Sequence, residues 1–159
     1  MTRSPNPAPS VRPFRLRAAK MADIEAIMRI CRQDARGGLD ATKPRQLAEA
    51  IADAEAFGGD SAQQLLVALL EPRLVDLIGF LNLRHLPDGR TRLIGLGVCQ
   101  TMRGQGVGRH LLHRSFCEAV LRESVLIEAP SGAATGYLQR FGFARTAPGG
   151  AVARRLTSG

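Results

Sequence analysis

The stretch of sequence that decides the fold is LGVCQTMRGQGVGRHLL, residues 96–112. It begins as the end of a strand and finishes as the start of an amphipathic helix, which we expect over about Val107–Arg122. Between them lies RGQGVG, residues 103–108, with three glycines at alternate positions. Glycine adopts positive φ without strain and lets the backbone approach a ligand closely. Because the first turn of a helix also leaves N–H groups unpaired, the loop predicts an anion site beside the charge of Arg103.

Three further kinds of glycine-containing loop match these residues less well. A P-loop ends in Gly-Lys followed by Ser or Thr, whereas this chain has Gly108, Arg109 and His110 there. A dinucleotide fingerprint needs its third glycine where Arg109 stands, although Glu128 lies near the place of a ribose-binding acid. A plain turn before a helix needs only one or two glycines. The glycine spacing therefore favours a loop that binds a phosphate-type anion.

Outward from the loop, hydrophobic periodicity predicts an α/β fold, a mixed sheet with helices on its faces in the order βααβββαβαββ. Residues 1–10 hold three prolines and predict a loose tail, and residues 11–159 predict one domain. The expected strands are 11–17, 65–70, 74–84, 92–98, 125–129 and a last hairpin that starts at Phe141 and turns at residues 148–150. The expected helices are 21–36, a second one capped by Thr42 and closed at Gly58, 107–122 and 131–140.

Composition narrows the classes of partner. The net charge of +8 and the pI of about 10.9 indicate attraction to polyanions, including a phosphorylated cofactor. Nucleic acid is not favoured, because no run of Lys or Arg exceeds two residues and aromatic residues make up only 4% of the chain. Three cysteines without CxxC spacing suggest neither a disulfide framework nor a metal site. We expect no membrane span and no signal peptide, and hence a cytoplasmic protein.

Together, these features resemble the GNAT superfamily of N-acetyltransferases. Residues 103–108 match the family's pyrophosphate signature, Arg/Gln-x-x-Gly-x-Gly/Ala, at every required position. The preceding Leu96-Gly97-Val98 is similar to the family's strand before the loop, and residues 139–143, QRFGF, to its late Gly-Phe element. The resemblance covers residues 11–156 and includes the order of the elements.

The resemblance implies a cofactor and a reaction. The cofactor would be acetyl-CoA or a related acyl-CoA, and the reaction would be direct acetyl transfer to a primary amine. Backbone groups of the central strand would pair with the pantetheine arm, the glycine-rich loop would hold the pyrophosphate, and a serine after the next strand would hydrogen-bond the cofactor. The cofactor-binding residues expected on this basis are Leu96, Val98, Arg103, Gly104, Gln105, Gly106, Val107, Gly108 and Ser131.

The catalytic groups depart from the family's pattern. Its tyrosine usually stands four residues before the Gly of Gly-Phe, but that place is Leu138, and Tyr137 lies one earlier. One residue turns a helical side chain by about 100°, so Tyr137 is either the acid that reprotonates the sulfur or a packing residue. The expected strand at residues 92–98 carries no acid, which makes Glu128 the best candidate base. The alternative is that the Glu128 carboxylate has only a structural role. Glu71, Asp76 and a water chain are weaker options.

The acceptor is the least determined part. It would enter a cleft between the two N-terminal helices and the late hairpin, and it could instead be macromolecular: a protein N-terminus, a lysine or an aminoacyl-tRNA. A CoA-binding module without catalysis is the rival of a different class. Dimers are common in the family, so a homodimer is also an expectation. His85, beside the hairpin at residues 87–89, is expected to be exposed.

Overall fold

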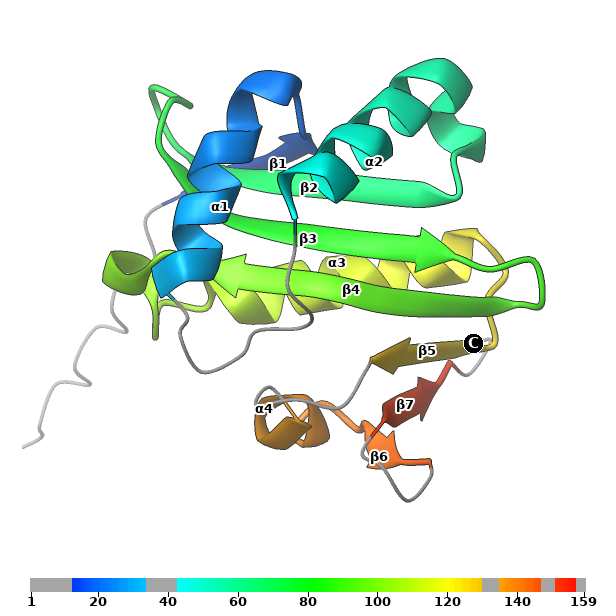
Figure 1. The fold of residues 1–159 in the computed structure, drawn as a ribbon. Coiled ribbons are helices and arrows are strands. Elements are labelled where there is room, and N and C mark those ends of the chain that lie inside the picture. Colours follow the sequence, from blue (N-terminus) through cyan, green and yellow to red (C-terminus); the bar gives the residue numbers. More distant parts are fainter. Residues whose placement is uncertain (1–12, 34–42, 130–134, 147–150, 157–159) are drawn as a thin grey trace, which may run out of the picture.

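The computed structural model describes residues 13–33, 43–129, 135–146 and 151–156. Seven strands form one sheet in the order β1-β2-β3-β4-β5-β7-β6 (Figure 1). The predicted order βααβββαβαββ and the α/β class are confirmed. The strands are β1 (Phe14–Ala18), β2 (Gln63–Leu70), β3 (Leu77–His85), β4 (Arg90–Val98), β5 (Leu126–Ala129), β6 (Ala144–Arg145) and β7 (Val152–Arg155). The helices are α1 (Ile24–Gln33), α2 (Pro44–Phe57), α3 (Val107–Leu121) and α4 (Thr135–Gln139).

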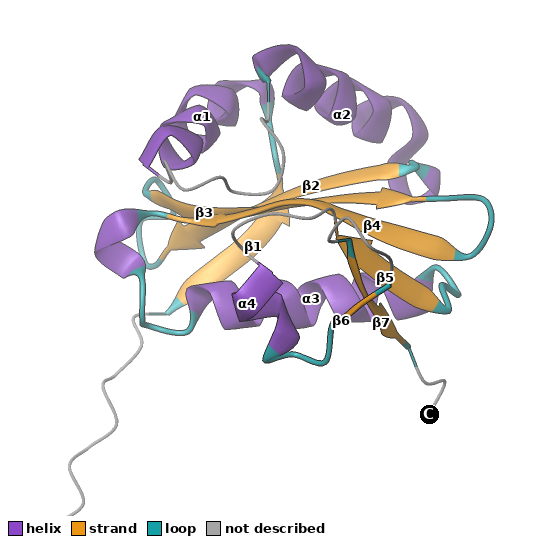
Figure 2. Ribbon diagram, turned by 60° about the horizontal axis from the view of Figure 1, so that its bottom comes forward, coloured by secondary structure: helices purple, strands orange, loops and turns teal. Residues whose placement is uncertain are grey.

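The helices form layers on the two faces of the sheet. Figure 2 shows α1 and α2 on one face and α3 and α4 on the other. Because side chains alternate along a strand, each strand contributes side chains to a separate hydrophobic core on each face. Leu81 and Leu83 pack under α3 with Leu111, while Phe80 packs with Ile27 under α1 and α2. We therefore call the two faces the α3 face and the α2 face.

The sheet opens beside β4. All neighbouring strands are antiparallel except β4 and β5, which pair in parallel only over residues 90–92 and 126–128. β5 ends at Ala129, whereas β4 continues to Val98, so the second half of β4 has no described strand on that edge. The register with β3 also shifts between Asn82 and Leu83, which places an irregularity of the bulge type at this point of β4.

Several predicted bounds were wrong. β3 begins at Leu77 and not at residue 74, because Leu74 has φ 54° and donates its N–H to the Leu70 carbonyl in a turn. Phe141 and Gly142 belong to the turn after α4, so the last hairpin starts later, at β6. The predicted tail at residues 1–10, the cap Thr42, Ser131 and the turn at residues 148–150 lie outside the described residues. No described helix is long and apolar enough to cross a membrane.

Candidate functional site

The glycine-rich loop has the backbone that its sequence predicts. Gly104 has φ 76° and Gly106 has φ 85°, both in the region that favours glycine. A Cβ atom added to either residue would meet nothing within 4 Å, so the space over both is open to a ligand. Gly106 is the N-cap of α3. The loop therefore presents bare main chain at the start of a helix.

The start of α3 leaves donors available. The first hydrogen bond into the helix runs from the His110 N–H to the Gly106 carbonyl, 3.0 Å. Within the described residues, no acceptor is found for the N–H groups of Val107, Gly108 and Arg109. Val107 is only 1% exposed, because its side chain anchors the helix in the core, so it can offer a ligand only its main chain. The exposed Arg103 donates from Nε to the Val98 carbonyl, 3.4 Å.

Tyr137 faces this helix start from α4. A Cβ atom on Gly108 would lie 3.1 Å from the Tyr137 hydroxyl and 3.5 Å from the nearest methyl group of Val98. Gly108 is thus small for a different reason from the two loop glycines: it makes room for a side chain. Leu138, at the family's usual tyrosine place, is 1% exposed and belongs to the core. Burial raises the pKa of Tyr137, against a smaller lowering by Arg109 and Arg140, and so keeps its hydroxyl protonated.

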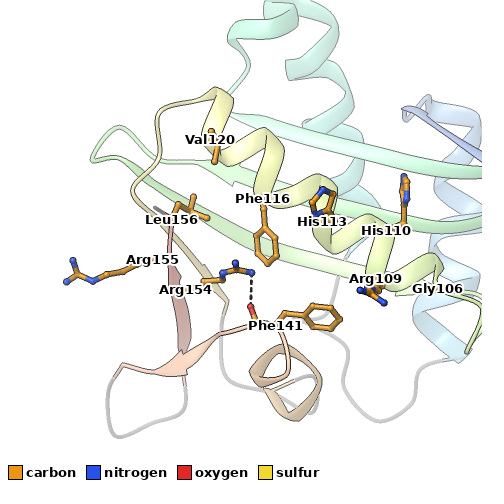
Figure 3. Close-up of a pocket in the computed structure, with 10 residues that line it drawn as sticks. All are labelled: Gly106, Arg109, His110, His113, Phe116, Val120, Phe141, Arg154, Arg155 and Leu156. Atoms are coloured by element: carbon orange, nitrogen blue, oxygen red, sulfur yellow. Dashed lines mark hydrogen bonds between the residues drawn. The ribbon is translucent and has the colours of Figure 1, made fainter. Parts of the chain in front are cut away.

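A cavity of about 610 Å³ adjoins the loop on the α3 face (Figure 3). We call it the α3-side cavity. Its wall includes Arg109 and His113 from α3 together with Arg154 and Arg155 from β7. The Arg154 guanidinium lies 4.3 Å from the centre of the Phe116 ring and donates to the Phe141 carbonyl, 2.9 Å. Cationic groups therefore surround the space next to Gly106, which suits a phosphorylated ligand.

A second cavity, of about 570 Å³, lies on the α2 face, and we call it the α2-side cavity. The register places one polar residue from each of four adjacent strands in a row along its floor. Glu128 binds two arginines: Arg92 donates from Nε and Nη2 to Oε1 at 3.1 and 3.0 Å, and Arg90 Nη1 lies 3.3 Å from Oε2. The row consists of Gln63, Arg84, Arg92 and Glu128.

The comparisons with known proteins agree with this geometry. The model of the acetyltransferase (GNAT) family matches residues 24–143. The chain belongs to this family. No curated protein sequence matches it. The GNAT fold and its acyl-CoA-dependent N-acetyltransferase activity, as predicted, are thereby confirmed.

Solved structures of other proteins superpose on most of the chain. PaiA N-acetyltransferase from Thermoplasma acidophilum, in complex with coenzyme A, is 13% identical, with a TM-score of 0.72 over 90% of this chain and 99% of the other. A GNAT acetyltransferase from Staphylococcus aureus is 13% identical, with a TM-score of 0.69 over 91% and 100%. N-acetylglutamate synthase from Neisseria gonorrhoeae, with coenzyme A and N-acetyl-glutamate, is 16% identical, with a TM-score of 0.74. The match includes 91% of this chain but only 35% of the longer synthase chain.

The structure groups the predicted site residues of this GNAT protein into two sets. The loop, Leu96, Val98 and Tyr137 lie at the end of β4 and the start of α3, whereas Glu128 lines the α2-side cavity. Sequence reasoning missed Asn82 and Arg84 in that cavity. Their signal was available, because two polar residues at alternate positions interrupt an apolar strand, but nothing in one sequence says what such residues face.

Proposed function

We propose that this GNAT protein transfers an acetyl group from acetyl-CoA to the primary amine of a small molecule. The observation that carries this proposal is the bare loop at Gly104 and Gly106, which opens toward unpaired N–H groups of α3. Each hydrogen bond to a charged group contributes about 1.5–3 kcal/mol, so a few of them would dominate binding of a pyrophosphate. The α3-side cavity, with Arg109 and Arg154 in its wall, is the place for the nucleotide end.

We expect the cofactor to cross the sheet where β4 continues past the end of its pairing with β5. Leu96 and Val98 lie on the half of β4 that has no described strand on its β5 side, and we expect the pantetheine arm along that edge. When bound, acetyl-CoA supplies the acetyl group: a C–N bond to the amine forms, the C–S bond breaks, the nitrogen loses a proton and the sulfur gains one. The donor would thus lie on the α3 face and the amine would arrive from the α2-side cavity.

Glu128 is the group that we propose takes the amine proton, through water. Its Oε1 is held by Arg92 in two hydrogen bonds, whereas Oε2 has only the 3.3 Å contact with Arg90. Oε1 therefore fixes the carboxylate, while Oε2, with one long hydrogen bond, keeps a lone pair that can take a proton. For the sulfur we propose Tyr137, whose raised pKa keeps the hydroxyl a donor at neutral pH. A cytoplasmic location and a homodimer stay predictions from the sequence.

Calorimetry and turnover test the proposal together. We expect acetyl-CoA and CoA to bind the purified protein, and free thiol to be released when amines are added. Absence of binding would contradict the cofactor site, and binding without thiol release from any amine would contradict the transfer. An alternative acceptor, an RNA-linked or protein amine, rests on the net charge of +8. It predicts tight, salt-dependent RNA or peptide binding in place of turnover with small amines.

A further inference from the structure

We propose that the α2-side cavity selects an acceptor amine that also carries a carboxylate, with Arg84 binding the carboxylate and Asn82 positioning the amine. This inference rests on the proposed function, because it concerns the acceptor of the same reaction. It would make the substrate an amino acid and not a simple amine or polyamine.

The first observation is a pair of like charges. Arg84 of β3 and Arg92 of β4 lie directly opposite each other in the sheet. Like charges in this position destabilise a sheet. Arg92 has the Glu128 carboxylate beside it, but Arg84 makes no hydrogen bond or ion pair with any described residue. Arg84 is therefore an exposed cation next to another cation, in the wall of a cavity, where an external anion can reach it.

The other charged side chains that line the α2-side cavity already have oppositely charged partners. Glu128 binds Arg90 and Arg92, and Glu49 accepts a hydrogen bond from Arg45, 3.1 Å. Arg90 also binds Asp88 at 2.6 Å. Among the described charged groups that line the cavity, Arg84 is thus the one without an opposite charge. A guanidinium binds a carboxylate through two parallel hydrogen bonds, so the unmatched group indicates a carboxylate on the ligand.

The second observation is independent of charge. Asn82 is 4% exposed, lines the same cavity, and its Oδ1 is the buried side-chain atom of the described chain that has no hydrogen-bond partner. A buried acceptor without a donor is costly, and native structures rarely keep one. Oδ1 is itself enclosed, so an amine N–H reaches it once the amide group turns about its last bond and exchanges the places of its oxygen and nitrogen, which are nearly equal in size. Asn82 is also paired with Gly95, on the half of β4 that lies beyond its contact with β5.

The spacing of the two residues sets the size of the ligand. Asn82 and Arg84 lie on the same face of β3, two residues apart, which is about 6.6 Å along a strand. The long Arg84 side chain can shorten that separation to the few ångströms between the amine and the carboxylate of an amino acid. With the carboxylate on Arg84, the amine would lie beside Asn82 and on the side toward the opening in the sheet.

Matched substrates test the inference. Thiol release from acetyl-CoA is measured with each of the twenty L-amino acids and with the α-carboxamide of each. The amide has nearly the same size and a less basic amine, so only recognition of the carboxylate would favour the acid. We expect at least one amino acid to exceed its amide about 10- to 100-fold in kcat/KM. Arg84→Gln should raise KM for that acid by the same factor, leave its amide unchanged, and be partly rescued by Arg84→Lys.

Two controls separate this result from damage to the fold. Arg15→Gln removes one exposed arginine outside the cavity and should leave both substrates unchanged. Asn82→Leu should lower kcat for both members of a pair, and it should raise Tm because it removes the unsatisfied buried oxygen. A lowered Tm would make Asn82 a structural residue and contradict its part in the proposal.

The outcomes distinguish this inference from the proposed function. The inference is overturned if the amino acids and their amides turn over at equal rates, or if Arg84→Gln slows acid and amide equally. In both cases the proposed acetyltransferase activity still stands. If CoA binds but no amine turns over, calorimetry of the same amino acids with the CoA-bound protein decides. If an amino acid binds and Arg84→Gln weakens that binding, the carboxylate site is supported without the transfer reaction. If no amino acid binds, both the carboxylate site and the proposed function are overturned.

Discussion

The two faces of the sheet carry cavities of similar volume that are built in different ways. The α3-side cavity, about 610 Å³, adjoins a site made of consecutive residues, the loop at 103–108 and the first turn of α3. The α2-side cavity, about 570 Å³, takes its floor from four strands that are distant in sequence. The first site offers main-chain donors and the second offers side chains. Their difference separates a site for a common cofactor from a site for a particular acceptor.

The faces also differ in how fully the polar side chains of β2, β3 and β4 are matched. On the α3 face, His85 lies 2.9 Å from the Thr91 hydroxyl, which is 2.7 Å from the Ser124 hydroxyl. Gln64 accepts from His85 and donates to Glu118, 3.0 Å. On the α2 face, by contrast, Asn82 Oδ1 and the Arg84 guanidinium have no described partner. Matched groups hold the sheet to its helix, and unmatched groups indicate where a ligand completes the structure.

The largest expected effect falls on the loop. A valine at position 106 would have to adopt φ 85°, which strains a β-branched residue, and its side chain would fill the open space over the loop. Two lost hydrogen bonds of about 2 kcal/mol each correspond to about a 1000-fold loss in affinity. We therefore expect Gly106→Val to weaken CoA binding at least about 1000-fold by calorimetry.

The matched control for this variant is Gly59→Val. Gly59 also has open space around the position of a Cβ atom, but its φ lies outside the left-handed region and it is remote in sequence from the loop. It should bind CoA normally. Unchanged binding in a folded Gly106→Val protein would remove the loop from the cofactor site and reverse the roles that we give to the two faces.

The sequence predicted the two sites unequally, for a physical reason. The loop could be predicted because glycine spacing, positive φ and a helix start all act within a few neighbouring residues. The α2-side cavity could not, because strand register brings Arg84, Arg92 and Glu128 together, and register depends on the whole sheet. His85 was predicted to be exposed beside a hairpin and is buried, since Gln64 and Thr91 reach it from two other segments.

The next effect tests the base on the acceptor side. Glu128→Gln keeps an oxygen that can accept from Arg92 but removes the basic carboxylate, so binding should survive while proton removal fails. General-base catalysis contributes roughly 10²–10⁴-fold, and we expect kcat to fall roughly 100- to 1000-fold with little change in the KM of the acceptor. Steady-state kinetics over a range of pH gives both constants. A rise in KM at constant kcat would instead show that Glu128 serves only to hold its arginines.

A smaller effect is expected on the donor side. Tyr137→Phe keeps the ring that packs against Phe141, with ring centres 5.0 Å apart, and removes only the hydroxyl over Gly108. Water can partly replace that proton donor, so kcat should fall about 100-fold or somewhat less, with acetyl-CoA affinity unchanged. An unchanged kcat would make Tyr137 a packing residue. Phe141→Leu is the matched control, because it loosens the same contact and leaves the hydroxyl in place.

The smallest effect probes whether the polar groups under α3 form a closed network. His85 is 9% exposed, and burial, aided by Arg122 and opposed by Glu118, lowers its pKa to about 4. As the pH falls below 6.5, the ordinary pKa of histidine, His85 binds a proton in the unfolded chain but not in the folded one. The free energy of unfolding therefore decreases between about pH 6.5 and 4. From pH 7.5 to 5, this amounts to about 2 kcal/mol.

Urea unfolding at several pH values measures this loss. His85→Gln, which cannot titrate but can still hydrogen-bond, should flatten the fall in unfolding free energy, whereas the exposed His113→Gln should not. An equal slope in wild type and His85→Gln would mean that the imidazole already accepts protons in the fold. The polar side chains of β2, β3 and β4 would then be incompletely matched on the α3 face as well, and an unmatched strand side chain would no longer single out the α2 face as the place where the acceptor binds.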